Sequence, residues 1–232
     1  MMRFRAVLFD YFNTLTTAVQ RGPRHAKVAQ LLGCDPTTWV NALDRSFMER
    51  ARGGYGPAVE GLRRLAAEAG GQPSLAQVLA AIEARVEAVQ ADVTLRPDTI
   101  PTLLALRSLG LHTAVISDCW FELPMFLPRT PLARLVDAQV YSVAVGSTKP
   151  DAVMYLTACE ALGVEPDECM YVGDGGSHEL TGAHLLGMTA VRLAAPDLGG
   201  HLTFEADANW HGPVITSLAH LPLILQRTPV PA

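Results

Sequence analysis

Short, mainly apolar runs recur along this chain. There are four of them: residues 3–9 (RFRAVLF), 113–117 (TAVIS), 169–173 (CMYVG) and 189–193 (TAVRL). The first three are followed directly by Asp10, Asp118 and Asp174. Apolar runs of this length without polar alternation are typical of strands that are buried on both faces of a parallel sheet. The pattern therefore predicts such a sheet, with acidic side chains at the carboxyl ends of its strands.

Helical patterns lie between the predicted strands, over residues 98–109, 151–162 and 177–186. Strands that alternate with helices at this spacing predict an α/β fold with a doubly wound, Rossmann-like parallel sheet. Ligands of such sheets bind in the crevice outside the carboxyl ends of the strands. The three aspartates should therefore face a ligand site.

The segment between the first and second strands has a different pattern. It lacks β-branched runs and is rich in Ala, Leu, Glu and Arg at helical spacing, which predicts helices over residues 24–32, 36–50, 58–69 and 74–90. We therefore expect a core domain of residues 1–16 and 93–232, with an all-helical domain of residues 17–92 inserted after the first strand. The glycine-rich turn 52–57 (RGGYGP) inside the insertion is suited to reach toward the core.

Composition narrows the class of protein. Of 232 residues, 49% are hydrophobic and 18% are charged, and the net charge is −5. This composition excludes a disordered chain, and the acidic balance without a basic stripe argues against a nucleic-acid partner. No apolar stretch reaches the length of a membrane span and no signal peptide is visible, so we expect no membrane association and a cytoplasmic protein.

The cysteines do not suggest a metal or disulfide framework. Cys34, Cys119, Cys159 and Cys169 lie far apart in sequence and form no CxxC pair. This spacing argues against a zinc site and against a disulfide scaffold. We expect four buried thiols.

Asp10 opens the first candidate motif, DYFNTL (residues 10–15). A carboxylate at a strand end can attack phosphorus if a cation offsets the repulsion between the two anions. Asn13 suits a tight turn, because asparagine tolerates a positive φ better than other non-glycine residues. Taken alone, an Asp at a strand end before a turn is more often a helix cap than a nucleophile.

Ser117 and Lys149 supply the second and third candidates. The Ser117 hydroxyl and the backbone N–H that follows it could hold a phosphate oxygen. Lys149 is one of only two lysines beside 16 arginines, and it precedes Pro150 at a predicted helix start. A compact ammonium group beside a helix N-terminus suits a phosphate or carboxylate site. The alternative for Lys149 is a solvated position in a loop.

The fourth candidate is GDGGSHE (residues 173–179), in which a strand end, a glycine turn and a helix start follow one another. Asp174 and Glu179 can face one crevice across that turn, and carboxylate oxygens are ligands that Mg²⁺ prefers. The same segment alone could be a simple turn. Four such pieces in order, three of them at strand ends and Lys149 at a helix start, indicate one shared site.

At this point the sequence resembles the haloacid dehalogenase (HAD) superfamily over essentially its whole length. The resemblance implies Asp10 as nucleophile, Ser117 as a phosphate hydrogen-bond donor, Lys149 as the neutralising charge, and Asp174 with Glu179 as magnesium ligand and its support. It implies residues 17–92 as a cap that closes over the substrate. We expect Asn13, Thr14 and Asp118 beside that substrate, and a Mg²⁺-dependent phosphatase that acts on a small phosphorylated metabolite through an aspartyl-phosphate.

Phe12 departs from the phosphatase pattern. Phosphatases of the family carry a second Asp at this position, which protonates the leaving group and then activates water. Phe12 cannot transfer a proton, although its carbonyl can still bind the metal, and loss of a general acid and base costs about 10²- to 10⁴-fold in rate. An aromatic residue here is similar to the haloacid dehalogenases, which need no metal and lack the acid that Asp174 provides. A phospho-ligand or partner-binding protein with little turnover is the third possibility.

We expect side chains of the helical insertion to determine which substrate is bound. Arg52 and Tyr55 in the glycine turn are our candidates for holding an anionic substrate group, with Arg21, Arg24, His25 and Arg50 as further possibilities. His25 or His178 could replace the missing base. For each of these side chains taken singly, a solvated helix face is the alternative.

Overall fold

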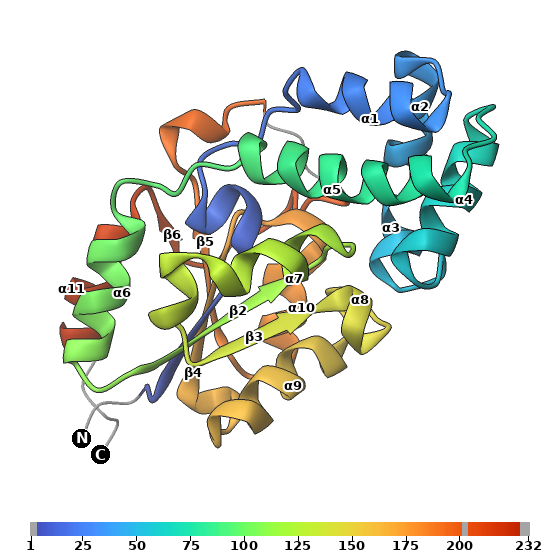
Figure 1. Cartoon of the computed structure of the whole chain (residues 1–232). Helices are drawn as coiled ribbons and strands as arrows, with labels where there is room; N and C mark the ends of the chain where they lie inside the picture. The colour runs from blue at the N-terminus through green and yellow to red at the C-terminus, as the bar shows by residue number, and fades with distance from the viewer. Residues whose placement is uncertain (1–3, 201–203, 228–232) are drawn as a thin grey trace.

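One parallel sheet forms the centre of the molecule in a computed structural model, which describes residues 4–200 and 204–227 (Figure 1). Its strands are β1 (Ala6–Phe9), β2 (His112–Ser117), β3 (Ala138–Tyr141), β4 (Cys169–Gly173), β5 (Thr189–Leu193) and β6 (Val214–Ile215). They lie in the order β3-β2-β1-β4-β5-β6, and every pair of neighbours is parallel. The predicted doubly wound α/β fold is confirmed.

Alternate residues of the strands feed two hydrophobic layers, as the twofold period of a strand requires. Val7 and Phe9 of β1 face one layer, which is covered by α6 (Thr99–Ser108), α7 (Glu122–Phe126) and α11 (Leu221–Arg227). Ala6 and Leu8 face the other layer, which is covered by α9 (Ala152–Leu162) and α10 (Glu179–Leu185). The short helix α8 (Ser142–Val145) follows β3. Helices on both faces explain why β1 is fully buried.

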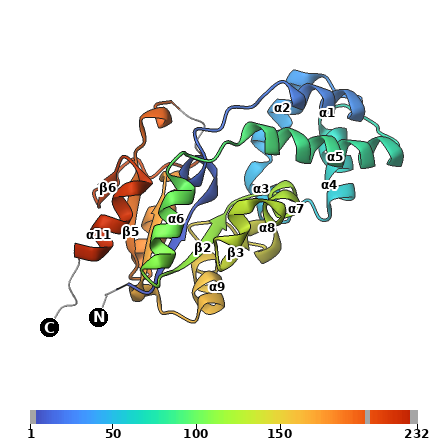
Figure 2. The same cartoon turned by 60° about the vertical axis from the view of Figure 1, so that its left-hand side comes forward.

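The segment between β1 and β2 is helical, as expected. It consists of α1 (Arg24–Leu32), α2 (Pro36–Arg45), α3 (Phe47–Ala51), α4 (Ala58–Glu68) and α5 (Leu75–Asp92). Helices α1, α2, α4 and α5 share a third hydrophobic cluster around the buried Trp39, which Trp120 and Phe121 of the core extend. Figures 1 and 2 show α1 to α5 beyond the ends toward which the arrows of β2 and β3 point.

Two connections tie the insertion to the sheet. Thr16 and Leu95 form an isolated antiparallel bridge, so the chain leaving β1 runs beside the chain that returns toward α6. Arg96 is buried beside this bridge, and its guanidinium donates to the carbonyl oxygens of Asn13 and Thr14. The two connections between the sheet and the insertion are thus bonded to each other where they leave the sheet.

Two strands and two helices differ most clearly from the sequence-based expectation. β3 and β6 were not predicted, because one has four residues at a half-buried position and the other only two. The predicted helix 36–50 breaks at Ser46, where the Ser46 hydroxyl donates to the carbonyl of Ala42 and the backbone leaves helical geometry. The predicted helix 177–186 begins only at Glu179, because Ser177 and His178 both have positive φ.

All four cysteines are free and buried, as predicted, although Cys159 and Cys169 bring their sulfur atoms to 3.8 Å. Within residues 4–200 and 204–227, none of the helices combines the length and the apolar character needed to cross a bilayer. Arg52 in the turn after α3 donates to the Thr148 hydroxyl at 2.9 Å, so this turn does reach the core.

Candidate active site

The carboxyl ends of three adjacent strands bring the predicted acids together. β1 lies between β2 and β4, so Asp10 is flanked by Asp118 and Asp174. The three side chains are buried and line one cavity. This is the switch point of a doubly wound sheet, where neighbouring connections leave in opposite directions and a crevice opens.

The loop after β1 is held in shape by Asn13. Its φ of 63° confirms the predicted left-handed turn. The Asn13 side-chain carbonyl accepts from the backbone N–H of Val19 at 2.9 Å, and its amide donates to Asp174 Oδ2 at 3.2 Å. Asn13 therefore fixes the backbone that presents Asp10 and also orients Asp174, a role that alanine could not fill.

Lys149 lies at the centre of the buried charges. Its Nζ donates to Asp10 Oδ1 and to Glu179 Oε2, each at 2.6 Å, and its backbone N–H donates to Asp118 Oδ1 at 3.0 Å. Burial alone would lower the pKa of Lys149, but the charges of Asp10 and Glu179 raise it well above its ordinary value. The lysine is therefore a permanent ammonium group in contact with the candidate nucleophile.

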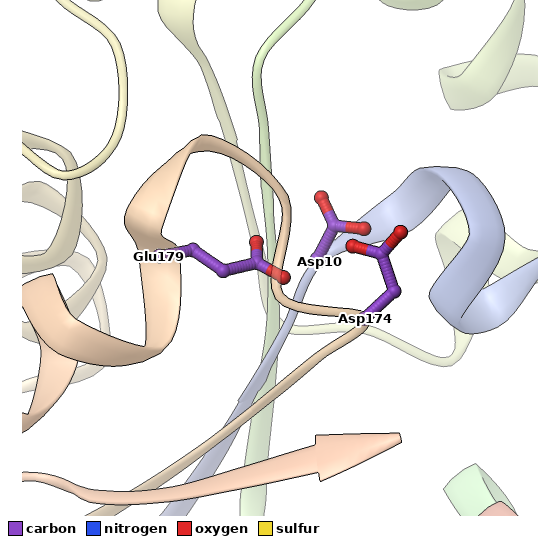
Figure 3. Close-up of side chains that lie close together, drawn as sticks. All are labelled: Asp10, Asp174 and Glu179. Carbon is purple, nitrogen blue, oxygen red and sulfur yellow. The ribbon is translucent and has the colours of Figure 1, made fainter. Parts of the chain in front are cut away.

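Asp10, Asp174 and Glu179 form a buried cluster whose oxygens lie within 4.8 Å of one another (Figure 3). Burial raises the pKa of Asp10 to about 6, the charge of Asp174 adds to this shift, and Lys149 opposes it. Three carboxylates face one ammonium group, which leaves two negative charges that a divalent cation would balance. The set of hard oxygen donors fits Mg²⁺.

Glu179 differs from the two aspartates in how it is engaged. Its Oε2 accepts from Lys149 and from the Tyr171 hydroxyl at 2.7 Å, and its Oε1 accepts from the backbone N–H of Gly175 at 3.0 Å. A side chain at Gly173 would place its Cβ 2.0 Å from Glu179 Oε1, so the glycine is required. Glu179 thus orients the lysine, whereas Asp10 and Asp174 are the better candidates for direct metal ligands.

The cavity beside this cluster has a volume of about 200 Å³ and lies between the sheet and the helical insertion. The core contributes Asp10, Phe12, Asn13 and Lys149, among others. The insertion contributes both charged and apolar side chains, including Arg50, Phe47 and Val89. A site of this size suits a small molecule whose reacting group contacts Asp10 and whose remainder contacts the insertion.

A chain of hydrogen bonds that includes one buried ion pair crosses the insertion side of the cavity. Arg85 of α5 donates to Glu122 of α7 at 2.6 Å and to His25 Nδ1 at 2.8 Å, and His25 Nε2 lies 2.6 Å from Asp92. Because arginine can only donate, Nδ1 accepts and the neutral His25 ring donates from Nε2 to Asp92. Burial and the charge of Arg85 lower the pKa of His25. With both ring nitrogens bonded, His25 has no lone pair available to act as a base in this arrangement.

Several predicted site residues lie outside the cavity wall. Arg52 is exposed and bonded to Thr148, and the Tyr55 hydroxyl donates to Glu68 at 2.7 Å, so neither faces the cavity. His178 is half exposed, with Nδ1 3.6 Å from Asp207. Substrate contacts from Arg52 and Tyr55, and a base at His178, are therefore not part of the function proposed below.

Ser117 and Thr14 lie deeper than the cavity wall. Both are completely buried, and neither side-chain hydroxyl has a hydrogen-bond partner among the described residues. A buried hydroxyl without a hydrogen-bond partner destabilises the folded protein, and a bound group that supplies the partner removes this cost. Their positions at the ends of β2 and β1 keep both residues as candidates for bonding an oxygen of a bound group.

Sequence reasoning missed Arg85, Glu122 and Tyr171. A signal existed for Arg85, which lies on the buried face of α5 together with Val78, Ala81 and Ala88. A charged residue within an apolar helical stripe requires a buried partner. Neither Glu122 nor Tyr171 stands out in this way, because their partners are distant in sequence.

A doubly wound sheet with a buried aspartate at the end of its first strand and a helical insertion after that strand defines a class of hydrolases. This chain belongs to the haloacid dehalogenase-like hydrolases, because the family model matches residues 4–187.

Its curated relatives include both phosphatases and dehalogenases. A glyceraldehyde 3-phosphate phosphatase of Methanopyrus kandleri is 35% identical over 133 residues, which cover 57% of this chain and 55% of that protein. (S)-2-haloacid dehalogenase 4A of Burkholderia cepacia is 31% identical over 110 residues, or 47% of each chain. The match thus spans about half the length of these relatives.

Solved structures share the fold at low sequence identity. L-2-haloacid dehalogenase of Xanthobacter autotrophicus superimposes with a TM-score of 0.66 at 19% identity, covering 97% of this chain and 100% of that one. A HAD phosphatase of Thermococcus onnurineus gives a TM-score of 0.60 at 24% identity, covering 96% and 98%. These likenesses establish the architecture alone.

Proposed function

We propose that this protein is a Mg²⁺-dependent phosphatase that acts on a small phosphorylated metabolite through an aspartyl-phosphate. The observation that carries the proposal is the position of Asp174 beside Asp10 in a cluster whose surplus negative charge a divalent cation would balance. An ester-forming dehalogenase has no use for that second carboxylate.

In this proposal Asp10 attacks phosphorus in line with the leaving alcohol, and Lys149 stabilises charge on the transferring oxygens. Ser117 offers its unpartnered hydroxyl to the phosphoryl group, with Asn13, Thr14 and Asp118 around it. Asp10, Asp174 and the Phe12 carbonyl would hold Mg²⁺, and Glu179 would support the site. When bound, the ion offsets repulsion between the phosphoryl group and the carboxylates. Residues 17–92 act as the cap over the substrate.

Phe12 makes hydrolysis of the aspartyl-phosphate the slow step of the proposed reaction. Water must attack the aspartyl-phosphate, and Phe12, which lines the cavity, cannot activate it. His25 is engaged at both nitrogens, so it does not compensate. Turnover is therefore slow, and esters with good leaving groups lose least from the absence of a general acid.

Dehalogenation is the second candidate, favoured by the aromatic Phe12 and by relatives named as haloacid dehalogenases. Asp174 argues against it, because a second buried carboxylate beside Asp10 repels the carboxylate of a 2-haloacid. A nearly inactive phospho-ligand or partner-binding protein is the third.

Product analysis separates these functions. We expect Mg²⁺-dependent release of phosphate from p-nitrophenyl phosphate, lost on chelation with EDTA and restored by added Mg²⁺. Metal-independent chloride release from 2-chloropropionate would instead identify a dehalogenase. If neither product forms and calorimetry detects no Mg²⁺ binding, the protein is a binder and the proposal is wrong.

Restoring the missing acid should accelerate the reaction. We expect Phe12→Asp to raise the kcat for p-nitrophenyl phosphate at least tenfold, since general acid–base catalysis contributes about 10²- to 10⁴-fold. Phe12→Asn is the matched control. Asparagine is a polar side chain of the same size as aspartate but cannot transfer a proton, so this variant should show no increase in kcat. Equal rates for the Asp and Asn variants would show that a missing acid and base does not limit turnover.

A further inference from the structure

Arg50 is a buried cation in the cavity wall that forms no salt bridge with any described carboxylate. Only 3% of its surface is exposed, yet it lines the same cavity as Asp10 and Lys149. Over residues 4–200 and 204–227, no acidic oxygen lies within ion-pairing distance of its guanidinium. Arginine almost never becomes buried unless it is paired. The missing partner therefore points to a ligand.

The guanidinium is held in place by neutral groups. Its Nε donates to the Ser46 hydroxyl at 2.9 Å and its Nη2 to the carbonyl of Leu43 at 2.7 Å, while its Cζ atom lies over the Trp120 ring, 4.7 Å from the ring centre. Nη1 has no acceptor in the described chain and is not sealed from solvent. A donor that is fixed by its other nitrogens binds an anion at little cost in side-chain entropy.

The acids near Arg50 are already engaged by other donors. Asp44 accepts from Arg21 at 2.6 Å, Asp92 lies 2.6 Å from His25 Nε2 and accepts from the backbone N–H of Gly22, and Glu122 accepts from Arg85. Burial lowers the pKa of Arg50 to about 10, so the side chain remains charged at neutral pH. Arg50 is thus the one charged donor of the cavity's insertion side whose charge is left for a substrate, among the residues that the structure describes.

We propose that Arg50 binds a carboxylate at the far end of the substrate, so that the enzyme acts on a short carboxylic acid that carries a phosphoryl group. This inference rests on the proposed phosphatase function for the identity of the reacting end. A single guanidinium matches the single charge of a carboxylate, whereas a second phosphate would bring a dianion close to the three acids that line this side of the cavity, Asp44, Asp92 and Glu122. The apolar Leu43, Phe47 and Val89, which also line the cavity, suit the short carbon chain between the two anionic groups.

Binding of phosphonates, which the enzyme cannot hydrolyse, tests this without relying on turnover. The full-length protein with Mg²⁺ is titrated by calorimetry with 3-phosphonopropionate and with propylphosphonate, which differ in the carboxylate. We expect the carboxylate ligand to bind about 10- to 100-fold more tightly, as a charge-assisted hydrogen bond provides. Ethane-1,2-diphosphonate, with a second phosphonate in place of the carboxylate, should bind more weakly than 3-phosphonopropionate.

Three variants assign the preference to Arg50. In Arg50→Gln, the affinities for 3-phosphonopropionate and propylphosphonate should differ by no more than about twofold, with the affinity for propylphosphonate unchanged. Arg50→Lys should retain an intermediate preference, because lysine keeps the positive charge but lacks the planar pair of N–H donors of a guanidinium. Arg52→Gln is the matched control, since it removes the same charge from an exposed position outside the cavity, and it should keep the full preference.

A preference that survives in Arg50→Gln, or that is absent from the wild type, overturns the inference. Equal weakening of both ligands in Arg50→Gln also overturns it, because Arg50 would then support the fold rather than the carboxylate. Failure of the proposed function has a different signature, namely no phosphate release from p-nitrophenyl phosphate whatever the phosphonate affinities.

Discussion

Asp10→Asn is expected to reduce phosphate release at least about 10⁴-fold, because loss of a nucleophile removes the covalent route entirely. The substitution keeps an oxygen that can accept from Lys149, which now donates to Asp10 Oδ1 at 2.6 Å. Burial and Asp174 both raise the pKa of Asp10, so the native carboxylate carries an electrostatic cost that the neutral amide avoids. We therefore expect the variant to have a melting temperature no lower than that of the wild type.

Asp174→Asn provides the comparison for this prediction. Asp174 is a candidate metal ligand and does not form a bond to phosphorus, so its variant should weaken Mg²⁺ binding and recover part of its rate at high Mg²⁺ concentration. Asp10→Asn should not recover at any Mg²⁺ concentration. Both are measured as initial rates of p-nitrophenyl phosphate cleavage across a Mg²⁺ titration. If the Asp10 variant keeps more than about one per cent of the wild-type rate, Asp10 is not the nucleophile.

The elements that the sequence predicted well are those that are buried on both faces, because their burial requires a run of mainly apolar residues. β4 and β5 were predicted with their observed bounds, since both are apolar runs between turns, and β5 lies beside β4 in the sheet. β3 and β6 lie at the two edges of the sheet, where hydrogen bonds to a neighbour, rather than an apolar run, define a strand. The break at Ser46 depends on a side-chain bond to its own helix, which periodicity does not reveal.

Some residues of the candidate site could likewise be predicted from the sequence, and others could not. Asp10, Lys149, Asp174 and Glu179 could be found because each stands next to a strand end or helix start, and the fold brings these points together. Choosing between Arg50 and Arg52 required the structure, because positions two apart in a helical turn point to different sides. Arg50 faces the cavity, while Arg52 is exposed and bonds Thr148. The proposed substrate specificity therefore depends on which arginine side chain points into the cavity, and the sequence pattern does not determine this.

Lys149→Met is expected to cost about 3–5 kcal/mol of unfolding free energy at pH 8, since removing one partner of a buried ion pair leaves the other charge uncompensated. Two carboxylates, those of Asp10 and Glu179, each lose a bond of 2.6 Å to the ammonium group. The free energy is measured by urea denaturation without metal. Lys27→Met is the control, because the other lysine is exposed on α1 and its loss should change stability by no more than about 0.5 kcal/mol.

The pH dependence of this deficit tests its cause. Lys149 lowers the pKa of Asp10, so in the variant that pKa lies above the value of about 6 in the native protein. A carboxyl whose pKa is higher in the folded than in the unfolded state binds its proton preferentially in the folded state, and stability rises as pH falls through the raised pKa. The deficit of Lys149→Met should therefore shrink between pH 8 and pH 5.5, and added Mg²⁺ should reduce it at pH 8. A deficit that is the same at both pH values and insensitive to Mg²⁺ would mean that packing of the lysine stem, rather than its charge, holds this site together.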